Sequence, residues 1–70
     1  MKDYNKLAKE ILSEAEFKEG GFVTKHISQG KSNALQAIRS AVDNMSDLYD
    51  LERDDIGIIS NIILKNLTGS

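Results

Sequence analysis

Cysteine, proline and tryptophan are absent from the 70-residue chain, and histidine occurs once. Without cysteine there is no disulfide framework and no cysteine-ligated zinc site, and His26 alone cannot build a histidine-rich metal site. No apolar run approaches the roughly 18 residues that a membrane-spanning helix needs. Lys6, Lys9 and Glu10 interrupt the N-terminal segment, so it does not resemble a signal peptide. Together with the lack of cysteine, this predicts a cytoplasmic protein with no membrane partner.

The chain is 40% apolar, which is enough for one small core. A domain of this size buries only about 60% of the surface of its unfolded chain, so residues 1–70 are predicted to form a single small domain. An enclosed catalytic cleft with its own supporting shell is hard to fit into such a domain. We therefore predict a protein that is not an enzyme and has no cofactor.

The apolar residues follow helical spacing over three segments: residues 3–17, 33–50 and 54–67. The predicted fold class is therefore all-α, a small three-helix bundle with short connections. A short extended or helical-turn segment is expected at residues 22–28, inside the connection between the first two helices. A strand over residues 56–60 stays open as an alternative, because β-branched residues lower helix propensity.

Helix-capping residues stand near the ends of these segments. Asp3 can accept hydrogen bonds from the first backbone N–H groups of the first helix, and Ser32 or Asn33 can do the same for the second. Gly69 follows the third helix, where a left-handed residue commonly ends a helix. These positions support the helix boundaries that the spacing predicts.

Charge is distributed unevenly along the chain, although the net charge is only −2. Residues 18–39 carry four basic residues and one acidic residue, a net charge of +3. Residues 40–55 carry six acidic residues and one basic residue, a net charge of −5. Segregated charge of this kind indicates a role in binding rather than in catalysis.

The leading functional hypothesis is that the chain binds another protein, as a small regulator or inhibitor. Acidic residues would share the outer face of the second helix, and the third helix has more apolar surface than one bundle face needs. Charge would steer the encounter, and apolar burial would supply most of the affinity. The surplus apolar surface also predicts a homodimer. The predicted partner-binding residues are Asp43, Asp47, Asp50, Asp54, Ile58 and Leu64.

The alternative hypothesis is that the basic segment 25–39 binds DNA, RNA or another anion. In a helix-turn-helix, the second predicted helix would enter the major groove of DNA. Two features oppose this alternative. The connection from Gly20 to Ser32 is longer than the usual turn of 3–4 residues, and acidic residues later in the same helix would repel phosphates. The predicted contact residues are Lys25, His26, Lys31, Gln36 and Arg39.

Three local patterns resemble known sites and fail on inspection. Residues 30–32 read Gly-Lys-Ser, as at the end of a phosphate-binding loop, but Lys25 stands where that loop needs glycine. The acidic residues of segment 43–55 lack the glycine and glutamate positions of a calcium-binding loop. His26 has no nucleophile or acid partner at a recognisable spacing. The sequence therefore predicts no catalytic residue and no metal ligand.

Overall fold

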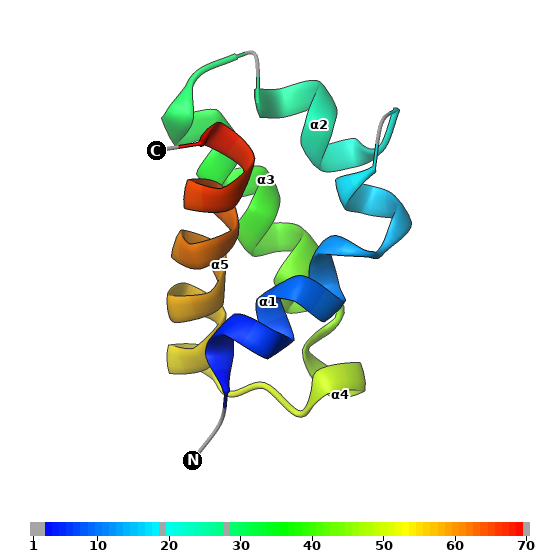
Figure 1. Cartoon of the computed structure of the whole chain (residues 1–70), viewed down its shortest axis with the longest axis vertical. Helices are drawn as coiled ribbons and strands as arrows, with labels where there is room; N and C mark the ends of the chain where they lie inside the picture. The colour runs from blue at the N-terminus through cyan, green and yellow to red at the C-terminus, as the bar shows by residue number, and fades with distance from the viewer. Residues whose placement is uncertain (1–2, 19, 28, 70) are drawn as a thin grey trace.

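Three long helices, built on the three apolar stripes of the sequence, form the bundle in Figure 1. The computed structural model describes residues 3–18, 20–27 and 29–69. Within these ranges there is no strand, so the all-α prediction is confirmed and the strand alternative is wrong. The same ranges contain no helix that is both long and apolar enough to cross a membrane. In chain order the elements are α1 (Tyr4–Leu12), the 3₁₀ turn η1 (Ala15–Phe17), α2 (Phe22–Ile27), α3 (Lys31–Asn44), α4 (Ser46–Tyr49) and α5 (Arg53–Thr68).

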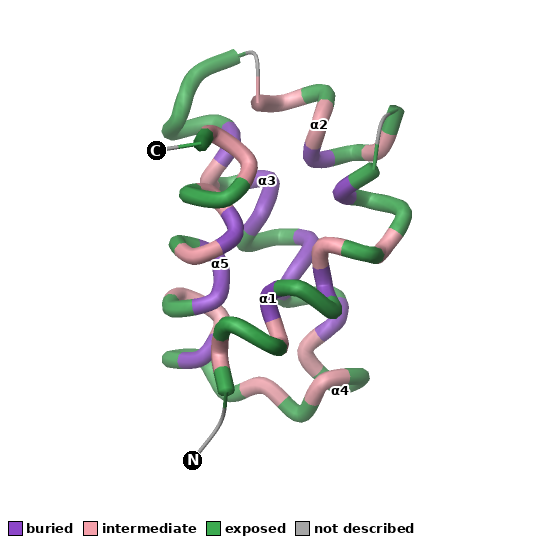
Figure 2. Tube along the Cα trace, viewed as in Figure 1, coloured by how far each residue is buried: buried purple, intermediate pink, exposed green. Residues whose placement is uncertain are grey.

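The core lies where α5 packs against both α1 and α3, and α2 packs against α3 and η1. Figure 2 shows the buried residues gathered along the inner sides of these helices. Burying one isoleucine or valine side chain contributes roughly 1.5–3 kcal/mol, so this cluster supplies most of the stabilisation of the bundle. Its members are Ala8, Ile11, Phe17, Val23, Ile38, Ala41, Val42, Met45, Ile59 and Ile63.

The first predicted helix is confirmed at its start and is shorter than predicted at its end. The Lys6 backbone N–H donates to the Asp3 carboxylate (3.1 Å), so Asp3 caps α1 as expected. The helix ends at Leu12, and the Ser13 hydroxyl bonds back to a carbonyl of the last turn. Phe17 lies off the apolar stripe of α1 and would face solvent on a continued helix. The turn η1 instead places it in the core.

The second predicted helix divides into two. It begins at Lys31 after Gly30, which makes no side-chain cap, and it ends at Asn44 rather than near Asp50. Met45 leaves helical geometry (φ −97°, ψ 2°) with its side chain still buried, and the separate short helix α4 follows. The Tyr49 hydroxyl then donates to the Glu14 carboxylate (2.8 Å), which ties α4 to the segment after α1. Propensity alone does not show this break, because the contact joins residues far apart in the sequence.

The start of α5 is fastened to α1 by a buried carboxylate. Asp55 is only 5% exposed, accepts the Tyr4 hydroxyl (2.8 Å) and also accepts the Glu52 backbone N–H (3.0 Å). The Glu52 side chain completes a capping box by accepting from the Asp55 backbone N–H. At the other end Gly69 takes the left-handed conformation (φ 72°) and ends the helix as predicted.

The connection between the first two predicted helices contains α2. The predicted helical turn at 22–28 is therefore a six-residue helix, Phe22–Ile27, and residue 28 lies outside the described residues. Gly20 precedes it with a positive φ of 84°, and the Thr24 hydroxyl donates to the Gly21 carbonyl (2.9 Å). Val23 is fully buried, so α2 forms part of the core rather than a loop over it.

Candidate nucleic-acid interface

The helices α2 and α3 are joined by a short turn. The first ends at Ile27 and the second begins at Lys31, so only residues 28–30 separate them. Gly30 in that turn has φ 113°, a conformation that favours glycine. A helix-turn-helix joins its two helices by a turn of 3–4 residues that often contains glycine. The connection between the first two predicted helices is long, as expected, but it contains α2, so the first objection to a helix-turn-helix does not apply to the pair α2 and α3.

The two helices hold each other through small and branched apolar side chains. Figure 1 shows them side by side in the upper part of the molecule, and the structure records their packing. Val23 of α2 is fully buried, as are Ala34 and Ile38 of α3, while Ala37 is nearly so. Because Ala34 and Ala37 have short side chains, α2 can approach the backbone of α3 closely. The pair is therefore a packed unit of the bundle.

The outer side of α3 is exposed and polar, and we call it the polar ridge. Its members project from the helix away from the core, because the buried residues of α3 occupy the opposite face. Apart from one acid they are basic, hydroxyl or amide side chains, which are the types that contact phosphates and base edges. The polar ridge consists of Lys31, Ser32, Asn33, Gln36, Arg39, Ser40 and Asp43.

Two grooves flank the polar ridge. The α2 groove lies between α2 and α3 and is lined by Phe22, His26, Gln29, Asn33, Gln36, Ala37 and Ser40. The α5 groove lies between α3 and α5 and is lined by Arg39, Ser40, Asp43, Arg53 and Ile56. Ser40 belongs to both, so the two grooves meet across the ridge.

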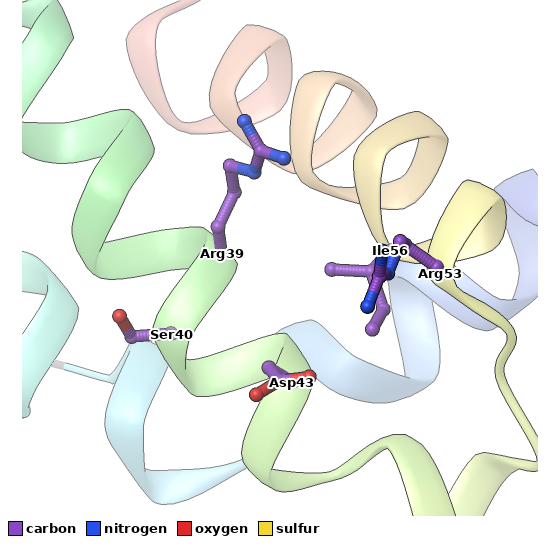
Figure 3. A pocket seen from close by; sticks show the side chains of 5 residues that line it. All are labelled: Arg39, Ser40, Asp43, Arg53 and Ile56. Carbon is purple, nitrogen blue, oxygen red and sulfur yellow. The ribbon is translucent and has the colours of Figure 1, made fainter.

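The α5 groove brings together two arginines from separate helices. Figure 3 shows Arg39 extending from α3 toward α5, with Arg53 and Ile56 on the first turns of α5. Asp43 lies one turn further along α3, in the same groove. The groove is therefore lined by one arginine from each helix, with one carboxylate between the same helices that would compete for the cations.

His26 forms part of the wall of the α2 groove. Its Nδ1 atom lies 2.8 Å from the Phe22 carbonyl oxygen, which can only accept, so Nδ1 carries the proton. The imidazole and the Phe22 ring are in contact, with centroids 4.7 Å apart and planes tilted by 51°. Phe22 is 48% exposed, so its ring presents apolar surface at the edge of the groove.

The acidic residues of the leading hypothesis are all exposed but do not share one helix face. Asp43 is on α3, Asp47 is on α4 and Asp54 is in the first turn of α5. Asp50 ends α4 and lines a third depression, next to α1, that contains none of the other three. A single acidic face required a helix continuous from 33 to 50, and the break at Met45 removes it.

The predicted apolar contacts are also separated. Ile58 is 42% exposed on α5, whereas Leu64 is half-buried and packs against the core. Leu48, which helical spacing assigns to the buried face, is 73% exposed, because the break before α4 turns it outward. Exposed apolar surface is therefore divided among α2, α4 and α5.

The structure places the residues of the alternative hypothesis on two helices, although the sequence put Lys25 and His26 in the connection between helices. Lys25 and His26 are on α2, and Lys31, Gln36 and Arg39 are on α3. Arg53 had no sequence signal, since it stands inside the acidic block. Asn33 and Ser40 were visible in the sequence as polar residues on the outer face of the second predicted helix, whereas Gln29 lies before that helix. The groove-lining residues that sequence reasoning missed include Phe22, Gln29 and Arg53.

Among residues 3–18, 20–27 and 29–69, no group of three histidine or acidic side chains could hold a metal ion. Comparison with known proteins gives no match to a family model, to a curated protein or to a solved structure. The function of the molecule must therefore be inferred from its own residues.

Proposed function

We propose that the chain binds nucleic acid through α2, Gln29 and Gly30 before α3, and the polar ridge of α3. The observation that carries the proposal is the short turn, because it joins two packed helices and leaves the outer side of the second one exposed. In a helix-turn-helix the second helix presents its early polar residues to the nucleic acid, while the first crosses the backbone.

The charge around the polar ridge supports this function despite the net charge of −2. Lys25 on α2, Lys31 and Arg39 on α3, and Arg53 at the start of α5 are all exposed, and Asp43 is the acidic member of the ridge. On α2 and α3 the three cations outnumber the one carboxylate of the ridge and attract phosphates locally, whereas Arg53 stands between the exposed Glu52 and Asp54 at the start of α5. Binding should therefore be strongly salt-dependent.

The proposal predicts that a labelled random-sequence DNA duplex binds at low salt and dissociates steeply between about 50 and 200 mM salt. Lys31→Ala and Arg39→Ala should each reduce the slope of log affinity against log salt by about 1, because each removes one phosphate contact. Asp43→Asn should tighten binding. Fluorescence anisotropy over a salt series measures all of these.

Lys9→Ala is the matched control. Lys9 is an exposed lysine on α1, so its loss changes the net charge as Lys31→Ala does without touching the polar ridge. Equal slopes for Lys9→Ala and Lys31→Ala would show that binding follows net charge alone and would refute the interface. No binding of DNA or RNA at about 50 mM salt would refute the function.

A second candidate function is the binding of another protein through α4, and one observation favours it. Leu48 is 73% exposed, and the exposed carboxylates of Asp47 and Asp50 stand on either side of it. An exposed leucine between acidic residues suits a partner with apolar and basic groups. The homodimer remains a prediction. The apolar surface that α5 could offer to a second copy is smaller than the sequence predicted, because Ile58 is exposed but Ile59 and Ile63 are buried in the core.

Affinity capture from the native host tests the second candidate. Wild-type chain should retain a partner that Leu48→Ser releases, and reversal of Asp47 and Asp50 to lysine should slow its association. Recovery of the same proteins by wild type and by Leu48→Ser would contradict it. Sedimentation at micromolar concentration with a mass near 7.8 kDa would contradict the homodimer.

A further inference from the structure

The shape of the polar ridge distinguishes between kinds of nucleic acid. An α-helix with its side chains is about 10–12 Å wide, and the major groove of B-form DNA is about 12 Å wide. The polar ridge stands between two grooves, so the outer side of α3 projects from the molecule. The major groove of an A-form RNA helix is too deep and narrow for side chains to read. The ridge therefore fits duplex DNA.

Three side-chain amides line the α2 groove, those of Gln29, Asn33 and Gln36, and the last two are on α3. The Asn33 amide nitrogen donates to the Gln29 carbonyl oxygen (3.2 Å), so Asn33 is engaged with the turn. Gln36 lies about one turn further along α3, is exposed and lines the same groove. In the part of the chain that the structure describes, the Gln36 side chain makes no hydrogen bond within the molecule. Of the two amides that α3 contributes to this groove, Gln36 is thus the one available to bind a base.

The cations lie on both flanks of Gln36. Arg39 points toward α5 and lines the α5 groove with Arg53, while Ser40 turns to the other side (Figure 3). Lys25 is on α2, which borders the α2 groove on the other side of the ridge, whereas Lys31 shares the helical stripe of Arg39. A helix in the major groove has a phosphate backbone on each side, so this arrangement suits two sets of backbone contacts around one central reading residue.

We infer that Gln36 reads an adenine in the major groove of duplex DNA, while the flanking cations bind the two phosphate backbones. The glutamine amide N–H can donate to adenine N7 while the amide oxygen accepts from the adenine N6 amino group. This paired contact is specific to adenine. The inference rests on the proposed function and adds the kind of nucleic acid, the base and the residue that selects it. Asp43 limits the inserted part to the first half of α3, because its carboxylate repels phosphate.

Selection from a pool of random-sequence DNA duplexes, followed by affinity measurements on the selected duplex, tests the inference. Wild-type chain should enrich an adenine at one position. Gln36→Ala should lose that preference and bind the selected duplex about 10-fold more weakly, with an unchanged salt slope. Asn61→Ala, which removes an exposed amide on α5, is the matched control and should retain the preference. Circular dichroism of each variant verifies that it is folded.

The possible results separate this inference from the function beneath it. Salt-dependent binding without base preference, or a preference that survives Gln36→Ala, would overturn the inference and leave nucleic-acid binding intact. Tighter binding of RNA than of duplex DNA would also overturn it. Absence of binding to any nucleic acid would overturn both.

Discussion

Gly21 lies against the backbone of η1, and replacing it with alanine tests how α2 is held. A Cβ atom at this position would lie 2.6 Å from the Glu16 carbonyl oxygen, 2.8 Å from the Glu16 carbonyl carbon and in still closer contact with the Ala15 carbonyl oxygen. All three are main-chain atoms, so no side-chain rotation relieves the overlap. Gly21→Ala must therefore push η1 and the start of α2 apart.

The cost follows from what lies on either side of Gly21. Phe17 in η1 is 5% exposed and Val23 in α2 is fully buried, so separating the two elements disturbs packed core side chains. The Gly21 backbone N–H also donates to the Lys18 carbonyl (2.8 Å), a bond that the displacement strains. Overpacking of this kind costs about 1–3 kcal/mol. In a domain of this size each 1 kcal/mol lowers the melting temperature by about 4–8 °C.

Gly57→Ala is the matched control because it makes the same chemical change in an open position. A Cβ atom at Gly57 would meet nothing within 4 Å, and Gly57 lies inside α5. Alanine there should raise stability by about 0.5–1 kcal/mol, since glycine is a poorer helix former. The two variants should therefore shift stability in opposite directions.

Urea denaturation followed by circular dichroism measures both free energies of unfolding. Gly21→Ala should also weaken binding of DNA, because α2 and α3 form one unit. If Gly21→Ala is as stable as the wild type while Gly57→Ala behaves as expected, the close approach of η1 and α2 is wrong. If Gly21→Ala is destabilised and binds DNA with wild-type affinity, the position of α2 does not matter for binding.

Two further predictions concern buried polar groups. Ser60 is fully buried and, among the described residues, its hydroxyl has no hydrogen-bond partner. Ser60→Ala should therefore raise the free energy of unfolding by about 1 kcal/mol. A lower free energy of unfolding in urea denaturation would show that the hydroxyl has a partner. The pKa of Tyr49 lies above 10.0 in the folded chain, because partial burial and the hydrogen bond to Glu14 both favour the neutral phenol. Its contribution to stability is therefore complete below pH 10 and is lost as the pH rises through the folded-state pKa. An NMR titration should give a higher midpoint for the Tyr49 ring in the folded chain than in the urea-unfolded chain. The folded-state midpoint should be lower for Glu14→Gln than for wild type. Equal folded and unfolded midpoints would contradict the prediction.

Local features determined the class of fold. Apolar residues at helical spacing identify the three long helices, since each helix must bury one stripe, and this spacing is a property of short segments. Asp3 and Gly69 mark two ends correctly for the same reason, because capping bonds join residues close together in the chain. The polar outer face of α3 was equally visible, as its members are separated by three or four residues.

The tertiary structure decided where helices break and which residues meet. Helix propensities differ by only tenths of a kcal/mol between ordinary residues, so contacts between distant segments override them. The break at Met45 depends on its burial and on the bond between Tyr49 and Glu14, and it disperses the acidic face that the spacing predicted. Packing of α5 against α3 likewise places Arg53 beside Arg39. The sequence by itself determined a helical bundle whose second predicted helix has a polar outer face, whereas only the folding of distant segments onto one core decided that α2 is a helix packed against α3.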